Sequence, residues 1–185
     1  MKKYLTILCM ALFMMPVLVA CSSDDDFETI YNEEGEVVGK MGKPEDCKLE
    51  IPKKSDMKNP FDEKYCSFYL NDKLDGREIS SLCAMSTKME GLMFAATFNH
   101  VDLSELKKGS KLDLLRVELG MSLSSDSRDY MYQKGQNITG SIYVRSIDGN
   151  SITVYLDHLK FNCEGGFHMT KGEYVLYGDL KLTVK

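Results

Sequence analysis

Three histidines, six cysteines and 28 carboxylates are the side chains of this 185-residue sequence that could do chemistry. His158, Cys163 and His168 are evenly spaced and are ligand types that zinc accepts. Residues five apart on a strand, however, face opposite sides and lie roughly 16 Å apart, so only a loop around Cys163 could unite them. No CxxC or HExxH spacing accompanies them. We therefore expect no metal and no cofactor, with His158 half-buried on a strand and His168 on a surface loop.

The carboxylates and possible nucleophiles give no stronger signal for an enzyme. The sequence has no G-x-S-x-G nucleophile elbow. A glycosidase needs two carboxylates that face each other across a cleft. Asp157 and Asp179 lie on the outward phases of two C-terminal strands, but solvated acids on a sheet surface are the favoured interpretation. We expect no catalytic residues, and a glycan-active enzyme is the least favoured function.

Tyrosines near the C-terminus form the most suggestive binding surface. On the predicted strands, Tyr143, Tyr155 and Tyr177 share the outward face, with Arg145 nearby. Such rings can stack on sugars or contact another protein. The favoured alternative is that residues 29–60 cover these rings, or that they are ordinary cross-strand pairs.

The first 21 residues predict where the protein resides. Lys2 and Lys3 precede an almost unbroken apolar run from Tyr4 to Ala20, and Cys21 follows. This is the order of a secretory signal peptide. Leu-Val-Ala-Cys at 18–21 resembles the lipobox of bacterial lipoproteins, which implies cleavage before Cys21 and lipid on its sulfur and amine. A plain membrane helix would be short, would contain a proline and would precede acids rather than a positive flank.

The polar run after the cysteine consists of Ser22, Ser23, Asp24, Asp25 and Asp26. It resembles the export tag that sends lipoproteins of gut Bacteroidetes to the outer face of the outer membrane, and a serine after the cysteine fits outer-membrane sorting. A run of like charges is also a solvated tether, and both interpretations can hold together. We expect a lipid-anchored protein of the outer membrane that faces the cell exterior.

Charge restricts the partners of the remaining chain. Removing residues 1–20, which carry two lysines and no acids, leaves 165 residues with 21 basic and 28 acidic side chains, a net charge of −7. Nucleic acids and anionic lipid surfaces require a basic patch, so neither is an expected partner. Contact with the membrane should come through the N-terminal lipid, because no second long apolar segment follows.

Besides the lipidated Cys21, the mature chain keeps four cysteines: Cys47, Cys66, Cys83 and Cys163. Four cysteines outside the cytoplasm permit two disulfides in three pairings. Their strand phases, however, place all four among apolar residues, where free cysteine behaves as a small hydrophobe. Free thiols are favoured over disulfides, but spacing leaves the choice open.

The chain divides into a signal peptide (1–20), an acidic flexible tether (21–28) and one β-rich domain (29–185). A hairpin is predicted around Glu34-Gly35-Glu36, and strands at 65–71 and 92–99. The one plausible helical turn is Asp102–Lys108. The apolar phase changes between Leu114 and Leu115, as a β-bulge would produce.

The C-terminal third shows the clearest strands. Residues 138–147 and 151–156 flank Asp148-Gly149-Asn150. A three-residue loop pairs Val144 with Val154 and keeps each face consistent, whereas a two-residue Asp-Gly turn would mix apolar and polar partners. The last strand buries every second residue from Tyr174 to Val184.

Many short alternating strands predict an all-β fold, an antiparallel β-sandwich with one short helical turn. A lipocalin-like β-barrel is the alternative, because both folds put the same residues inward. A sandwich fills its interior with side chains, whereas such a barrel holds a ligand.

Three segments resemble the β-rich domains of small Bacteroidetes lipoproteins of uncharacterised function: 106–109 (LKKG), 138–142 (ITGSI) and 172–178 (GEYVLYG). The resemblance brings no catalytic residues. We therefore expect a non-enzymatic, lipid-anchored surface protein that binds a glycan or an envelope or host protein. A small-ligand carrier with a barrel cavity is the alternative.

Overall fold

The computed structural model describes residues 26–52, 57–88, 91–122, 130–166 and 169–185. Over these residues the protein is all-β, as predicted, and its one helical element is the 3-10 turn η1 (Glu63–Tyr65). The strands are β1 (Phe27–Tyr31), β2 (Val37–Gly42), β3 (Lys48–Glu50), β4 (Met57–Lys58), β5 (Ser67–Leu74), β6 (Arg77–Met85), β7 (Leu92–Asn99), β8 (Leu114–Ser122), β9 (Tyr130–Lys134), β10 (Gln136–Asp148), β11 (Ser151–Cys163) and β12 (Gly172–Val184).

The helical turn predicted at Asp102–Lys108 is wrong. This segment makes two successive turns, in which Glu105 N donates to Asp102 O (3.2 Å) and Leu106 N to Leu103 O (3.3 Å). The Asp102 carboxylate accepts hydrogen bonds from the backbone N–H and the hydroxyl of Ser104, each at 2.8 Å. This is an Asx turn, which can also cap a helix, but the successive i→i+3 bonds end at Leu106 and no helix follows in this described segment.

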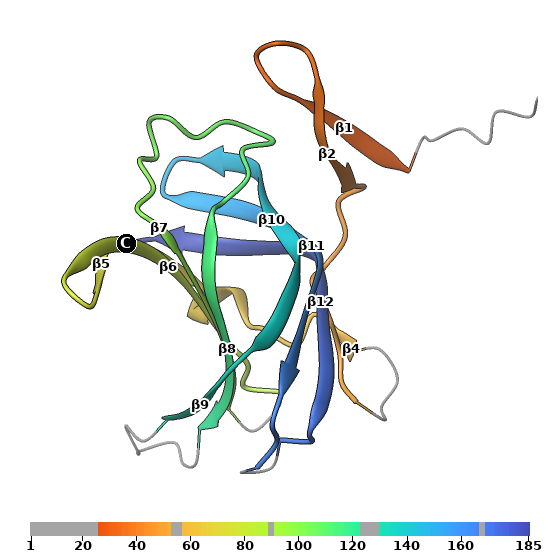
Figure 1. Cartoon of the computed structure of the whole chain (residues 1–185), viewed down its shortest axis with the longest axis vertical. Coiled ribbons are helices and arrows are strands. Elements are labelled where there is room, and N and C mark those ends of the chain that lie inside the picture. The colour runs from red at the N-terminus through yellow and green to blue at the C-terminus, as the bar shows by residue number, and fades with distance from the viewer. Residues whose placement is uncertain (1–25, 53–56, 89–90, 123–129, 167–168) are drawn as a thin grey trace, which may run out of the picture.

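Strands β1 and β2 form a separate hairpin, and the other ten strands form one sheet. Its order is β10-β11-β12-β5-β6-β7-β8-β9, with β3 beside β12 and β4 beside β3. Neighbouring strands are antiparallel except β12 and β5, which pair in parallel at Thr183–Ser67 and Val184–Phe68. Figure 1 shows that the sheet curls, so that β8 lies beside β10.

A line of irregular residues crosses the three longest strands. Gly140, His158 and Gly178 lie on adjacent strands β10, β11 and β12 and have φ of +90°, +43° and +96°. The strand registers shift here, and such bulges bend a strand. A Cβ at Gly140 would lie 2.6 Å from the carbonyl oxygen of Asp157, so this position requires glycine. We call this line the crease; along it β10–β12 turn from one layer into another (Figure 1).

The curled sheet closes on itself where β8, together with residues 109–113 before it, meets β10. We call this line the seam. At one end, Gly109 N donates to Val144 O (2.7 Å) and Leu112 N to Ile142 O (2.9 Å). At the other end, Gly135 N donates to Val117 O (2.8 Å). Hydrogen bonds thus join the edges of β8 and β10 at both ends of the seam, but not in the described stretch between these ends.

Side chains fill the space enclosed by the sheet. The apolar phases of the strands converge there, because each strand turns alternate residues inward. The packed interior and the curled sheet fit a β-sandwich or a half-barrel. The largest of its fully buried residues are Phe68, Phe94, Phe98, Phe161, Leu49, Leu82, Leu112, Leu119, Ile142, Ile152 and Leu156.

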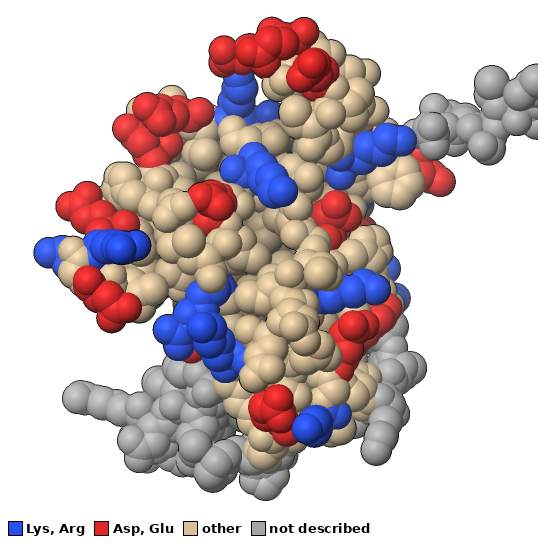
Figure 2. All heavy atoms as spheres, in the orientation of Figure 1, with Lys and Arg blue, Asp and Glu red and all other residues tan. Residues whose placement is uncertain are grey.

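The predicted N-terminal hairpin is present. Its first strand begins at Phe27. Ile30 and Met41 face the sheet and form a small apolar cluster with Tyr143 and Tyr155, separate from the main core. In Figure 2 acidic side chains gather at the hairpin tip, and both signs of charge mix over the rest of the visible face.

The predicted register of the β10–β11 hairpin is confirmed, and its loop length is wrong. Val144 pairs with Val154, but Asp148 pairs with Ser151, so the loop has two residues. The additional residue is a bulge at Arg145, where the register shifts. The phase change predicted in β8 is likewise present as a register shift around Leu115.

The four cysteines of the β-rich domain are free thiols in the structure. Cys47, Cys66 and Cys163 are buried, as their phases predict. The interpretation of Cys83 is wrong, because its neighbours Leu82 and Ala84 take the inward phase of β6 and leave Cys83 half-buried on the opposite face.

Candidate ligand pocket and the covered tyrosine face

Most of the N-terminal signals lie outside the described residues. These are the predicted signal peptide at 1–20, Cys21, Ser22, Ser23, Asp24 and Asp25, and His168 lies outside as well. Asp26 is described, and its carboxylate is 3.0 Å from Lys43 Nζ. Both side chains are largely exposed, so this ion pair contributes little stability. Within the described residues, no helix is long and apolar enough to cross a membrane.

The tyrosine face is mostly covered. Tyr143 and Tyr155 are only 5% and 3% exposed, because the β1–β2 hairpin lies over them. The hairpin approaches closely at two glycines: a Cβ at Gly39 would lie 2.7 Å from Tyr143 Oη, and one at Gly42 would lie 3.0 Å from Tyr155 Oη. The hypothesis of an exposed ligand face is therefore wrong for these two rings, and the favoured alternative, coverage by residues 29–60, is the arrangement found.

Arg145 is buried rather than displayed. The bulge turns its side chain under the hairpin, where Nε is 2.7 Å from Asp179 Oδ1 and Nη2 donates to Gly42 O at 2.7 Å. Its guanidinium also lies 4.9 Å from the centre of the Tyr155 ring. Arg145 thus ties the hairpin to β12 and is not available to a ligand.

Asp179 is the partner of this arginine, not a solvated surface acid. Its second carboxylate oxygen accepts the Glu45 N–H at 3.0 Å. Burial raises the pKa of Asp179, and the hydrogen bond and charge of Arg145 oppose that rise. Asp157, the other acid considered, is half-exposed and contacts His158 at 3.3 Å. The two acids have different partners, and neither geometry indicates a catalytic pair.

His158 and Cys163, two of the three residues weighed as metal ligands, have different surroundings, and the third, His168, lies outside the described residues. His158 is exposed and stacks on the Tyr177 ring, with 5.3 Å between centroids. Cys163 is buried, and burial raises the pKa of its thiol to about 11. Lys48 Nζ lies 5.2 Å from the centroid of the same Tyr177 ring. Among the residues that the structure describes, no three His, Cys, Asp or Glu side chains are placed to hold a metal ion.

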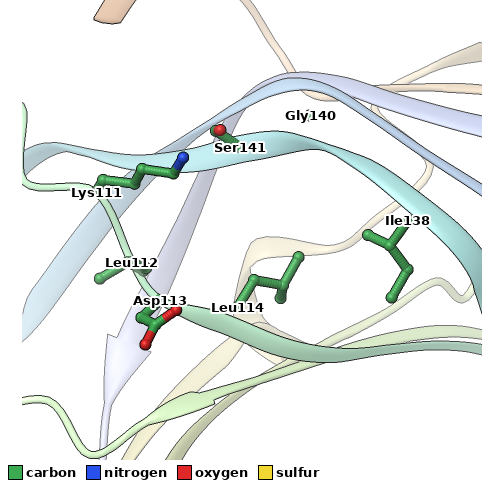
Figure 3. Close-up of a pocket in the computed structure, with 7 residues that line it drawn as sticks. All are labelled: Lys111, Leu112, Asp113, Leu114, Ile138, Gly140 and Ser141. Atoms are coloured by element: carbon green, nitrogen blue, oxygen red, sulfur yellow. The ribbon is translucent and has the colours of Figure 1, made fainter. Parts of the chain in front are cut away.

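A pocket opens in the seam, and sequence reasoning missed it. Its cavity volume is about 500 Å³, within the range of small-ligand sites. Figure 3 shows that Leu114 and Ile138 point into it from opposite strands, while Lys111 extends toward Ser141 along its rim. The lining residues are Lys111, Leu112, Asp113, Leu114, Ile138, Gly140 and Ser141.

The crease explains why the seam opens here. Gly140 lies on the crease, and register shifts on either side of Thr139 bend β10. Strand β8 has its own bulge at Leu115. The two edges therefore separate between their ties. The one sequence signal was the glycine within Ile138–Ile142, which we noted only as the start of a hairpin.

A second, smaller cavity of about 250 Å³ lies beside the Arg145–Asp179 pair. Two of its charged residues neutralise each other, since Lys181 Nζ is 2.5 Å from Glu63 Oε1. Asp179 is also engaged, and Cys66 is a buried thiol whose pKa burial raises to about 11. The seam pocket is the better candidate site, because its lysine lies at an open rim.

Comparison with protein-family models, curated proteins and solved structures found no match for the chain. The fold and the site thus define the class of protein by themselves: an all-β body with a filled interior, a docked N-terminal hairpin and a lateral pocket in its seam.

Proposed function

We propose that this chain is a lipid-anchored lipoprotein of the outer membrane, of the small Bacteroidetes type, that faces the cell exterior and binds a partner without catalysing a reaction. The observation that carries the proposal is the short distance in sequence between Cys21 and Phe27, where the folded body begins. Five residues separate them, and their extended reach is roughly 20 Å. A lipid on Cys21 would therefore hold the body close to the membrane surface.

A binding role fits the state of the reactive side chains. The buried thiols have raised pKa values, which disfavours the nucleophilic thiolate. Asp179 is held by Arg145, and His158 is stacked on Tyr177. The carrier function is less well supported, because side chains fill the interior where its ligand would lie. The partner is a glycan or an envelope or host protein, met at the open rim of the seam pocket.

Lipid attachment is tested by labelling cells that produce the full chain with radioactive palmitate. We expect Cys21→Ala to abolish the label and to accumulate the uncleaved precursor. Cys9→Ala is the matched control, since Cys9 lies within the segment to be removed, and it should leave the label unchanged. Label retained in Cys21→Ala would refute the anchor.

Surface display is tested by adding protease to intact cells. Because Asp26 also pairs with Lys43, the export variant changes Asp24 and Asp25 to Ala, and Lys43→Ala controls for that pair. We expect digestion of the wild type and of Lys43→Ala, and protection of the double variant. Equal digestion of all three proteins would mean that the acidic run is only a tether and not an export signal. Protection of the wild type would refute display on the cell surface.

A further inference from the structure

The seam pocket lies between two strand edges that are not joined to each other. Among the described residues, the backbone hydrogen bonds across the seam involve residues 109–112 and 117 on one side and 135 and 142–144 on the other. No such bond joins 113–116 to 137–141. Strand β8 uses its other edge at 113–116 to pair with β7, and β10 uses its other edge to pair with β11. The facing edges therefore present backbone donors and acceptors to the pocket.

Backbone groups of this kind are obligatory hydrogen-bonding groups, and an extended segment satisfies them in a regular ladder. Addition of a peptide strand to an exposed sheet edge is a recurring mode of recognition, with affinity from the main chain and specificity from side-chain pockets. The apolar side chains of Leu114 and Ile138, both half-buried, offer such a pocket for one side chain.

The charges on the rim indicate the polarity of the ligand. Asp113 is engaged, because its carboxylate accepts a hydrogen bond from Asn99. Lys111 is exposed, no carboxylate among the described residues pairs with it, and it extends toward the Ser141 hydroxyl (Figure 3). An ammonium group and a hydroxyl that line the same pocket are suited to a carboxylate, which the ammonium holds through a charge-assisted hydrogen bond.

We propose that the seam pocket binds a short extended peptide segment, whose backbone pairs with the open strand edges and whose carboxylate lies at Lys111 and Ser141. An apolar side chain of the peptide packs between Leu114 and Ile138. The proposal rests on the proposed binding function and names its ligand class, but it does not depend on the lipid anchor. A protein partner is thereby favoured over a glycan.

The test measures binding of fluorescent, N-terminally blocked pentapeptides to the purified full chain in detergent. The panel alternates Val, Leu or Thr with polar residues and ends in Asp with a free carboxylate, and each member has an amidated Asn counterpart. We expect saturable binding that weakens at least tenfold with the counterpart. Lys111→Glu should also weaken binding of the acidic peptide about tenfold. Its affinity for the amidated Asn peptide should equal that of the wild type. Lys40→Glu, an equal charge change on the hairpin, should have no effect.

Hydrogen exchange distinguishes strand pairing from simple attraction of charge. Saturation with peptide should slow amide exchange in 113–116 and 137–141 at least tenfold. Unchanged exchange, or acetate competing as well as the free peptide, would overturn the proposal in favour of an anion site. Absence of binding throughout the panel at millimolar concentration would overturn the site, while palmitate labelling and surface display would still decide the anchor separately.

Discussion

The ion pair beneath the hairpin provides a quantitative test of the fold. The side chains of Arg145 and Asp179 are only 10% and 13% exposed, and their atoms are 2.7 Å apart. Replacing Arg145 by Met removes the counter-charge, leaves the carboxylate buried, and deprives Gly42 O of its donor. Breaking a buried pair from one side costs about 3–5 kcal/mol, so we expect Arg145→Met to lose that much of its free energy of unfolding at pH 7.

The loss should depend on pH in a defined direction. Burial already raises the pKa of Asp179, and without Arg145 the pKa rises further. A carboxyl group with a raised folded-state pKa binds its proton more tightly in the folded state, so the stability it contributes is present at low pH and is lost as pH rises through that pKa. Acidification protonates Asp179 in the variant and relieves the cost. The difference from the wild type should therefore shrink as pH falls from 7 toward 4.5.

The assay is urea unfolding of chain 22–185, followed by circular dichroism, at both pH values. Lys181→Met is the control, because its pair with Glu63 is more than half exposed and should contribute less than about 1 kcal/mol. Arg145→Met combined with Asp179→Leu removes both charges and should recover most of the loss. A loss below about 1 kcal/mol for Arg145→Met, or a loss independent of pH, would refute the reasoning.

Three further predictions address the crease, the core and the thiols. Gly140→Ala should lower the free energy of unfolding by more than about 2 kcal/mol in the same urea assay, because the strain of a positive φ adds to the clash of the new Cβ with a carbonyl oxygen. Gly149→Ala is the control: it has the positive φ but open space around it, and it should cost about 1 kcal/mol. Phe98→Ala should cost about 3–5 kcal/mol, and a smaller value would mean that the core collapses around the site. Since burial raises the pKa of Cys66 to about 11, iodoacetamide at pH 8 should alkylate it only after unfolding, as peptide mass spectrometry can measure.

The sequence predicted pairing well where apolar alternation is continuous. The match of Val144 with Val154 follows from keeping the two faces consistent, and it is correct. The same argument placed the additional residue in the loop, whereas it is the bulge at Arg145. Alternation of apolar and polar residues predicts which residues pair across the two strands. It does not predict whether the one unpaired residue lies in the loop or in a strand, because an added loop residue and a bulge shift the register equally.

Alternation also does not predict whether a second layer of the chain covers the outward face of a sheet. Tyr143 and Tyr155 were correctly placed outward, but whether a second layer covers them depends on the docking of residues about 100 positions away in the chain, at Ile30 and Met41. The seam pocket was missed for a related reason: it forms where β8 and β10, which are not adjacent in the sheet order, approach after the sheet curls.

The hairpin also has a mechanical consequence. The chain enters it at Asp26 and leaves it at Lys43, and these two residues are held side by side by a backbone hydrogen bond of 3.2 Å and an ion pair. A pull on residue 26 against the body thus acts on one end of the hairpin and opens its bonds singly rather than all at once. Complete opening would lengthen the linker by about 55 Å. The main core, which is separate from the small apolar cluster, would remain folded while this length is released.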